Sequence, residues 1–444
     1  MQRLQKNLFI YTFGCQMNVH DSEKIAALME KSGYASVDDV GKADLIIINT
    51  CSVRERAAQK VYSQLGRLKK FKKMKPKLII GVGGCLAQQL GSKFIERVPH
   101  LDLVFGTHNI HSLPDLIAKI EETGQPVVRT EFHEEVKSLG ILAPTKNGKV
   151  TAYVTIMQGC NNFCSYCVVP HLRGKEESRS LTEIVKEVEV LAGRGIKEVT
   201  LLGQNVNSYG RAIGNRHDFA DLLHEIGSIA GIERIRFTTS HPKDLSDKLV
   251  CCFSEVDKLC EHIHLPVQTG SDRVLKMMNR YYTNAEYCER VDKLRSICPG
   301  ISITSDIIVG FPGEADGDFQ ATIDMMGKIR FDNSFSFKYS ERDGTAAAEL
   351  GDKVSECVKT DRLKIVQALQ EKHTLEKNEA MIGNTEEILV EEISKNSKED
   401  IAGRTRTNKI VNFRGSHTLI GKTVSVLIID AYQHSLKGRL LDVN

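Results

Sequence analysis

The first 120 residues alternate short, continuously apolar runs with longer amphipathic stretches. The apolar runs predict strands near residues 8–13, 45–48, 77–82 and 101–105. The amphipathic stretches predict helices at Asp21–Lys31, Arg54–Lys75 and Leu113–Ile120. Continuously apolar strands between helices are typical of a parallel sheet that is covered on both faces. Such a domain carries its sites beyond the carboxyl ends of its strands.

This rhythm stops after residue 123 and then returns. The following segment contains Pro126, Gly140 and Pro144 and predicts a linker. Six further strand–helix units come after it, with strands near 152–157, 198–202, 234–239, 262–265, 301–309 and 334–337. Six units predict a partial (β/α)6 barrel better than a closed eight-stranded one.

From about Asn384 the pattern changes to short strands without helices. Strands are expected at 386–393, 410–413 and 422–429, which indicates a small all-β barrel. The chain is therefore predicted to be an α/β protein with a second, all-β fold at its end. The expected domains are residues 6–123, 146–376 and 377–444, with residues 124–145 as the linker.

Composition restricts the class of protein. The 444 residues are 41% hydrophobic and 26% charged, with a net charge of +3, which excludes a disordered or fibrous chain. No apolar run approaches the roughly 18 residues of a membrane helix, and the amino terminus leads directly into a strand. We therefore expect a cytoplasmic protein without a membrane partner. Twelve cysteines in a reducing compartment favour metal binding over disulfides.

One set of cysteines is local. Cys160, Cys164 and Cys167 follow the first strand of the predicted barrel, in a loop with two Asn residues and a Ser. Thiolates at this spacing can bind three irons of a cubane and leave the fourth iron open. Zinc is disfavoured because no fourth ligand has a finger-like spacing, His171 being the nearest candidate.

Residues 159–167 resemble the CxxxCxxC signature of the radical S-adenosylmethionine superfamily, with the aromatic Tyr166 before the last cysteine. The resemblance implies a 4Fe–4S cluster whose open iron binds the amino and carboxylate groups of S-adenosylmethionine. It also implies a partial barrel and reductive cleavage of S-adenosylmethionine to a 5′-deoxyadenosyl radical.

The second set is dispersed. Cys15, Cys51 and Cys85 each come directly after a predicted strand of the first domain. The carboxyl ends of parallel strands lie at one edge, so three thiolates are expected to converge there. Gly14 and the pair Gly83-Gly84 would let the backbone approach a bulky cluster. The alternative is three buried free thiols, since cysteine is often buried.

The residues around these cysteines resemble three motifs of the methylthiotransferase family. The motifs are Thr12-Phe13-Gly14-Cys15-Gln16-Met17-Asn18, Asn49-Thr50-Cys51-Ser52-Val53-Arg54-Glu55 and Gly84-Cys85-Leu86-Ala87-Gln88. The resemblance covers the whole chain and implies a methylthiotransferase domain with an auxiliary 4Fe–4S cluster, a radical S-adenosylmethionine barrel and a C-terminal TRAM domain. Gln16-Met17 favours the branch that acts on dimethylallyl-adenosine in tRNA.

The remaining chemistry-bearing residues are weaker signals. Cys251, Cys252, Cys260, Cys288, Cys298 and Cys357 fit no ligand spacing and are expected to be packing residues. His262 and His264 alternate on one strand, so we expect same-face neighbours and no metal site. The resemblance to the radical S-adenosylmethionine superfamily implies contacts with S-adenosylmethionine, and we expect them from Tyr166, Gln204, Gln268 and Gly310. No catalytic residue is predicted beyond the cluster ligands.

Two basic segments are candidates for RNA contact. Residues 67–77 hold seven positive charges and no acid, which is either an RNA surface or a solvated helix face. The small barrel has seven Lys and Arg against three Asp from Asp400 onward. A basic β-barrel suits tRNA phosphates, and we expect contacts from Arg404, Arg406, Lys409 and Arg414.

These observations predict a radical methylthiotransferase that converts dimethylallyl-adenosine beside the tRNA anticodon to its 2-methylthio derivative. The implied cofactors are two 4Fe–4S clusters, with S-adenosylmethionine as cosubstrate. The implied partners are tRNA, a low-potential electron donor such as flavodoxin or ferredoxin, and a sulfur donor. Two alternatives stay open: the same chemistry on threonylcarbamoyl-adenosine tRNA or a ribosomal protein, and a non-catalytic iron–sulfur RNA-binding regulator.

Overall fold

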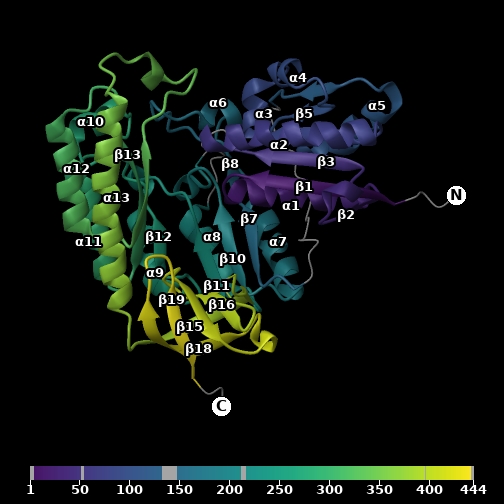
Figure 1. Cartoon of the computed structure of the whole chain (residues 1–444). Coiled ribbons are helices and arrows are strands. Elements are labelled where there is room, and N and C mark those ends of the chain that lie inside the picture. Colours follow the sequence, from purple (N-terminus) through teal and green to yellow (C-terminus); the bar gives the residue numbers. More distant parts are fainter. Residues whose placement is uncertain (1–4, 52–54, 133–147, 212–216, 396, 442–444) are drawn as a thin grey trace. The chain divides into compact units, whose positions relative to one another are not determined.

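The computed structural model describes residues 5–51, 55–132, 148–211, 217–395 and 397–441. The chain divides into two compact units. The first comprises residues 1–147, 158–160 and 168–177, and the second comprises residues 148–157, 161–167 and 178–444. Figure 1 labels their helices and strands.

The first unit is built on one parallel sheet of six strands in the order β2-β1-β3-β4-β5-β6. The strands are β1 (Lys6–Phe13), β2 (Tyr34–Ser36), β3 (Leu45–Thr50), β4 (Ile79–Gly84), β5 (Leu103–Phe105) and β6 (Val127–Arg129). Every residue of β3 and β4 is buried, as a parallel sheet with two covered faces requires.

Helices cover both faces of this sheet. They are α1 (Gln16–Lys31), α2 (Glu55–Met74), α3 (Cys85–Leu90), α4 (Lys93–Arg97) and α5 (Leu113–Thr123). Alternate residues of β3 point to opposite sides: Ile46 and Ile48 pack with α2, α3 and α4, whereas Leu45 and Ile47 pack with α1 and α5.

Two edge strands of this sheet were not predicted. β2 and β6 have three residues each, too few to show a hydrophobic period. β6 pairs with β5, so the sheet extends into the segment expected to be a linker. Residues 133–145 of that linker, and Ser52-Val53-Arg54 of the second motif, lie outside the described residues.

The second unit contains the predicted partial barrel. Its strands are β7 (Thr151–Thr155), β10 (Glu198–Leu202), β11 (Arg234–Phe237), β12 (His262–His264), β13 (Ser302–Val309) and β14 (Asn333–Lys338). They pair in parallel as β7-β10-β11 and β12-β13-β14, and a parallel bridge from Ile235 to Leu259 links the two sheets. Within the described part of the chain, β7 and β14 do not pair, so the barrel is open.

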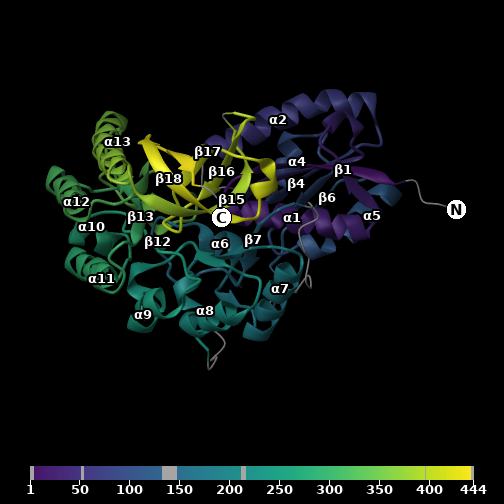
Figure 2. The same ribbon diagram turned by 90° about the horizontal axis from the view of Figure 1, so that it is seen from below.

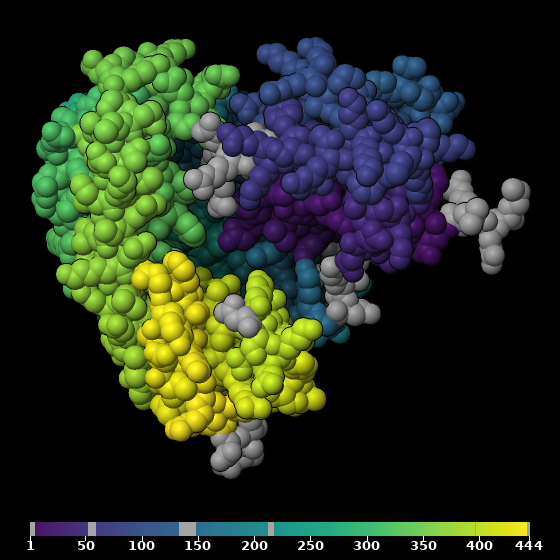
Figure 3. Space-filling view, viewed as in Figure 1, coloured from purple at the N-terminus to yellow at the C-terminus, as the bar shows by residue number. Residues whose placement is uncertain are grey.

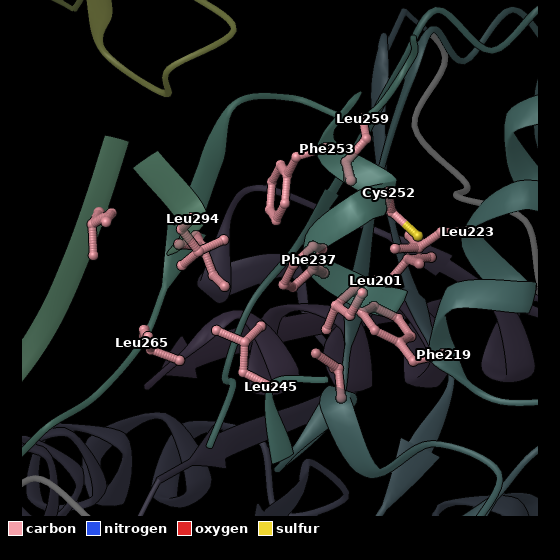
Figure 4. Close-up of a cluster of buried hydrophobic side chains, with 14 of the residues drawn as sticks. Leu201, Phe219, Leu223, Phe237, Leu245, Cys252, Phe253, Leu259, Leu265 and Leu294 are labelled. Carbon is pink, nitrogen blue, oxygen red and sulfur yellow. The ribbon is translucent and has the colours of Figure 1, made fainter. Parts of the chain in front are cut away.

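Helices α7 to α13 form an arc around these strands (Figures 1 and 2). Their bounds are α7 (Leu181–Gly193), α8 (Phe219–Ser228), α9 (Asp247–Glu255), α10 (Asp272–Met277), α11 (Asn284–Ile297), α12 (Asp316–Ile329) and α13 (Glu356–Glu379). A large apolar core lies between helices and strands, and Figure 4 shows part of it. There Phe219 of α8 meets Phe237 of β11 edge to face at 5.1 Å. Between β7 and α7 the chain carries β8 (Met157–Gln158), α6 (Val169–Arg173) and β9 (Glu177–Ser178).

The chain ends in a closed five-stranded barrel in the order β15-β16-β17-β19-β18. The strands are β15 (Thr385–Ile393), β16 (Asp400–Arg404), β17 (Ile410–Arg414), β18 (Thr423–Ala431) and β19 (Leu436–Leu440). The all-β prediction is confirmed, although β16 and β19 were not predicted. Each of these two strands contains a glycine and several charged or polar residues, which hide the alternating pattern.

This small barrel is attached to the amino ends of the larger barrel's strands. Arg234 and Arg236, at the start of β11, donate hydrogen bonds to the carbonyl oxygens of Arg404, Thr405 and Arg406. In return, Arg406 donates to the carbonyl oxygens of Asp257 and Leu259 and pairs with Glu261, just before β12. Thr423 donates to Glu233 at 3.0 Å. Figure 3 shows the small barrel, in yellow, continuous with α13.

Candidate functional site

Three strand ends of the first sheet carry the dispersed cysteines. Cys51 and Cys85 directly follow β3 and β4, and Cys15 follows β1 after Gly14; the three strands are adjacent in the sheet. The last residues of these strands are in register, Phe13 beside Thr50 and Thr50 beside Gly84. Cys51 and Cys85 are buried and Cys15 is half-buried. The expected gathering of the three residues at one sheet edge is therefore observed.

Two glycines at this edge have no room for a side chain. A Cβ atom on Gly84 would lie 2.5 Å from the carbonyl oxygen of Thr50, and Gly84 has a φ of +90°. A Cβ atom on Gly14 would lie 2.8 Å from the Cβ of Cys51. Both positions require glycine because the backbone segments that bear the thiols approach each other closely.

A polar network supports the same edge. The Asn18 side-chain oxygen accepts from the backbone N–H of Cys15 at 3.3 Å. The Asn49 amide donates to the Asn18 carbonyl oxygen at 2.8 Å and to the Ser22 hydroxyl at 3.0 Å. These buried amides fix the loop after β1 against the end of β3.

Arg173 adds a buried positive charge beside the thiols. It is only 4% exposed, lies at the end of α6 and donates to the Asp21 carboxylate at 3.1 Å. Burial lowers the pKa of its guanidinium, but nearby Cys85, Asp21 and Cys15 outweigh this effect, so the pKa lies above its usual value. Its backbone is fixed by His108, and Thr107 donates to Leu172 at 3.0 Å.

The electrostatics of this edge favour a thiolate at Cys15. A hydrogen bond with the Cys51 thiol lowers the pKa of Cys15 to about 6, although burial opposes it, and the charge of Arg173 acts in the same direction. By contrast, burial raises the pKa of Cys252 to about 12 and that of Cys260 to about 11. A thiolate is the form that binds metal, so Cys15 differs chemically from these core thiols.

The donor set fits a cluster better than a single ion. Among the described residues, no group of three or more His, Cys, Asp or Glu side chains is arranged to hold one metal ion. A cubane spreads three thiolates over three irons, so its ligands do not converge on one point. Three cysteines at one sheet edge, with close backbone and a buried guanidinium, fit such a group.

The local cysteine motif is held by a second set of contacts. In the second unit, Cys164 is buried, and its sulfur lies 3.6 Å from the Arg280 guanidinium and 4.0 Å from His241 Nε2. Arg280 also donates to the Tyr282 hydroxyl at 2.9 Å. Burial, followed by the charge of Arg280, lowers the pKa of His241, so its imidazole is neutral.

The loop backbone is fixed as well. The Ser165 hydroxyl donates to the Met277 carbonyl oxygen at 2.8 Å, and the Ser165 carbonyl oxygen accepts from the N–H of Ala347. In the first unit, the N–H of Cys160 donates to the carbonyl oxygen of Gly174 at 3.3 Å. Backbone and side-chain hydrogen bonds therefore hold the loop at Cys160 and at Ser165.

Left-handed residues mark the carboxyl ends of the barrel strands. Thr239, Gln268 and Gly310 follow β11, β12 and β13 with φ values of +70°, +76° and +72°. A β-branched residue such as Thr239 adopts this conformation only under strain, and strain of this kind collects at functional sites. Thr239 was not among the residues predicted from the sequence.

The expected cosubstrate contacts lie at this end of the second unit. Gln204 follows β10, Gln268 is buried beside Ile307, and the N–H of Gly310 donates to Glu314. Tyr166 packs against the small buried cluster that includes Phe311 and Tyr339, and burial raises the pKa of its hydroxyl. Sequence reasoning missed Arg280 and His241, which are distant in the chain from the cysteines they approach.

The four cations of the small barrel have different surroundings. Arg406 pairs with Glu261, and Lys409 donates to the Asn378 side chain at 2.7 Å. Arg404 lies 3.4 Å from Glu391 and 3.2 Å from the Asn408 side-chain oxygen. Arg414 is 84% exposed at its side chain and lies 3.4 Å from Glu399. Of the four, Arg414 is the one directed to solvent.

The structure also shows the surroundings of the basic run at residues 67–77 and of the two histidines of β12. In the basic run, Lys72 pairs with Asp102 and Lys75 with Asp44, whereas Lys69, Lys70 and Lys73 are exposed. His262 and His264 both contact the Thr304 hydroxyl, as expected of same-face neighbours. No described helix has the length and apolar character needed to cross a bilayer.

An open barrel of six parallel strands, followed at its first strand by CxxxCxxC, is the architecture of the radical S-adenosylmethionine superfamily, and the profile of that superfamily matches residues 154–326. Residues 7–106 match the family described as "Uncharacterized protein family UPF0004", and residues 379–441 match the TRAM domain. The cofactor of the superfamily is a 4Fe–4S cluster that binds S-adenosylmethionine. The predicted fold class and superfamily are confirmed.

Relatives cover nearly the whole chain. A tRNA-2-methylthio-N(6)-dimethylallyladenosine synthase of Syntrophus aciditrophicus is 61% identical over 98% of this chain and 95% of its own length. The synthase of the same name from Geobacter metallireducens is 51% identical over 98% of each chain. The chain belongs to the family of tRNA-2-methylthio-N(6)-dimethylallyladenosine synthases.

A solved structure shares the fold at low identity. The radical S-adenosylmethionine methyltransferase TsrM from Kitasatospora setae, with tryptophan substrate and an S-adenosylmethionine analogue bound, has a TM-score of 0.56. It is 15% identical and covers 74% of this chain and 72% of its own. This likeness supports the fold alone.

Proposed function

We propose that the chain replaces the C2 hydrogen of a dimethylallyl-adenosine beside the tRNA anticodon with a methylthio group. The observation that carries this proposal is the match, over 98% of the chain at 61% identity, to a relative named for that reaction. Threonylcarbamoyl-adenosine tRNA and a ribosomal protein are less favoured substrates, because the similar relatives carry the dimethylallyladenosine name.

Two 4Fe–4S clusters are assigned to the two cysteine sets. Cys160, Cys164 and Cys167 hold the one whose open iron takes S-adenosylmethionine, and Cys15, Cys51 and Cys85 hold the auxiliary one. The lowered pKa of Cys15 and the crowding at Gly14 and Gly84 support the second assignment. When bound, the clusters supply the electron that cleaves one S-adenosylmethionine and the place where sulfur is methylated by another.

The residues of the chain have positioning roles in this scheme. Tyr166, Gln204, Gln268 and Gly310 are assigned to S-adenosylmethionine, since they belong to the motif loop and the strand ends. Arg280 and His241 fix Cys164 and exclude water from it. A low-potential donor such as flavodoxin or ferredoxin and a separate sulfur donor complete the reaction, which we place in the cytoplasm.

The tRNA contact is assigned to exposed cations. Arg414 suits a phosphate because its side chain is directed to solvent, and Lys69, Lys70 and Lys73 offer a second basic surface. Arg404, Arg406 and Lys409 are weaker candidates, since their paired side chains are much less exposed than that of Arg414. The target adenosine has to leave its stack for its C2 atom to be reached.

Nucleoside mass spectrometry tests the proposal. The reconstituted protein is incubated anaerobically with a reductant, S-adenosylmethionine and anticodon stem-loop RNA that carries dimethylallyl-adenosine. A matched RNA with threonylcarbamoyl-adenosine and a ribosomal protein substrate serve as the competing reactions. We expect the 2-methylthio product from the dimethylallyl RNA.

The outcomes separate the open alternatives. Product from the threonylcarbamoyl RNA or the ribosomal protein alone would move the chain to another substrate. A protein that releases no 5′-deoxyadenosine from S-adenosylmethionine under any condition would be a non-catalytic binder, which would overturn the proposal.

A further inference from the structure

The last strand of the partial barrel has an inverted pattern of exposure. In β14, Ser334 and Ser336 are half-buried, whereas Phe335 and Phe337 are 51% and 42% exposed. An edge strand of a folded domain normally buries its aromatic residues and exposes its serines. Two large apolar rings exposed at i and i+2 on one strand therefore require a reason.

The opposite face of β14 is covered by α13. Gln370 donates to the carbonyl oxygen of Phe331, and Thr374 to that of Asp332, at the start of the strand. The small serines let this helix pack closely. Phe335 and Phe337 point to the other face, which is the inner face of the barrel.

The register shows which groups share that inner face. Asp306 of β13 is paired with Phe335, and Ile308 with Phe337. His264 of β12 lies 6.2 Å from Phe335, edge to face, and its Nε2 is 3.6 Å from the Asp306 carboxylate. Ile308 packs in the same small cluster as Tyr166 of the cysteine motif loop. The face is thus continuous with the site end of the barrel.

We propose that Phe335 and Phe337 form a stacking surface for the adenine base of the target nucleotide and its apolar N6 substituent. The inference rests on the proposed function, which supplies a base that must leave its stack. Aromatic side chains are what proteins use to hold unstacked bases, because every base has a π face. His264, oriented by Asp306 and Thr304, offers a polar group for the edge of the base.

The occupant follows from the composition of the face. A dimethylallyl-adenine has a flat ring to stack and a branched hydrocarbon to bury, and the face offers two aromatic rings and Ile308. A threonylcarbamoyl group carries a carboxylate. It would lie beside Asp306, with repulsion between like charges.

The test uses the absence of tryptophan from the chain. Phe335→Trp and Phe337→Trp each introduce one fluorophore on the proposed surface. Ile365→Trp is the matched control, because Ile365 is 50% exposed on the outer helix α13. We expect dimethylallyl stem-loop RNA to quench tryptophan at 335 and 337 but not at 365.

Affinity provides a second measurement. The wild-type protein should bind dimethylallyl RNA more tightly than the same RNA with unmodified adenosine. In the double variant Phe335→Ala, Phe337→Ala this ratio of affinities should fall about tenfold or more. Ile365→Ala should keep the full preference. If the double variant does not fold, the tryptophan variants still decide.

Three results would overturn the inference. These are equal quenching at 335, 337 and 365, quenching by S-adenosylmethionine alone, and an unchanged preference in the folded double variant. The second would assign the surface to the cosubstrate's adenine. Formation of the methylthio product by the wild-type protein, measured in parallel, separates this inference from the proposed function. If the wild-type protein forms the product but the double variant keeps its binding preference, only the stacking surface is contradicted.

Discussion

The two cysteine sites are built in opposite ways. Cys160, Cys164 and Cys167 lie within eight consecutive residues, so their proximity in the chain needs no tertiary structure. Cys15, Cys51 and Cys85 come from three strands and meet only when β1, β3 and β4 are paired. The local set can therefore be recognised from spacing, whereas the dispersed set depends on the sheet. Each set nevertheless has a buried guanidinium beside it, Arg173 at the dispersed set and Arg280 at the local one.

The largest effect is expected from the local set. Changing Cys160, Cys164 and Cys167 together to Ala should lower the iron content after reconstitution from about eight to about four per chain. Release of 5′-deoxyadenosine should stop, because the cluster that reduces S-adenosylmethionine would be lost. The control Cys288→Ala with Cys298→Ala should keep about eight irons, since burial raises the pKa of both thiols. Unchanged iron in the triple variant would refute the ligand assignment.

The dispersed set should separate two half-reactions. With Cys15, Cys51 and Cys85 changed to Ala, cleavage of S-adenosylmethionine should continue while methylthiolated RNA disappears. Product chromatography measures both compounds in one sample. If the methylthio product still formed, the first sheet would not hold the sulfur, and the contrast between the two sites would have no chemical meaning.

An effect of intermediate size is expected from Arg173, the buried cation beside the dispersed cysteines. In a protein without the local set, Arg173→Met should make the auxiliary cluster harder to reduce, because a positive charge favours the more negative state. A charge-assisted contact of about 1.5–3 kcal/mol corresponds to a shift of roughly 65–130 mV for one electron. A redox titration followed by electron paramagnetic resonance measures it.

Two variants control this measurement. Arg173→Lys should recover part of the shift because it restores the charge. Asp21→Asn should move the potential in the opposite direction, since it removes a negative charge that pairs with Arg173. If Arg173→Met, Arg173→Lys and Asp21→Asn all had the same reduction potential as the protein with Arg173 and Asp21 intact, the guanidinium would contribute only to packing.

The smallest effect is expected from two cations of the small barrel, Arg406 and Arg414, which are close in sequence but differ in exposure and in their partners. Arg414→Glu should weaken tRNA binding modestly and reduce the salt slope by about one. Arg406→Gln should leave the slope unchanged and lower the free energy of unfolding, because its contacts are with Glu261 and two carbonyl oxygens. Binding at several salt concentrations and thermal unfolding separate the two. A shallower slope in Arg406→Gln would contradict this division.

Much of the architecture could be predicted from the hydrophobic pattern. The long strands and amphipathic helices were found because each is long enough to show its period. The three-residue strands β2 and β6 carry no such pattern. Arg280 and Cys164 are 116 residues apart, and Arg173 and Asp21 are 152 apart. Contacts at such separations follow from tertiary structure, and a single sequence holds no periodic signal for them.

The cations of the small barrel illustrate the same limit. A run of positive residues predicts a surface because charge usually remains solvated. The sequence does not show that the Glu261 carboxylate and the carbonyl oxygens of Asp257 and Leu259, just before β12, accept hydrogen bonds from Arg406. Phe335 and Phe337 are the reverse case, in which the alternating Ser-Phe pattern was visible but the direction of burial was not.

The arginines at the start of β11 have a consequence for synthesis on the ribosome. Arg234 and Arg236 are buried, yet the carbonyl oxygens that accept their hydrogen bonds are made about 170 residues later. At roughly 5–20 residues per second, translation leaves these guanidinium groups without those carbonyl acceptors for about 10–30 s. Glu198 is made before Arg236 and pairs with it at 2.9 Å, so during that time Arg234 is the group that has to remain hydrated. A nascent chain that terminates before Glu387 would therefore leave Arg234 without its carbonyl acceptors, a cost that appears only in the incomplete protein.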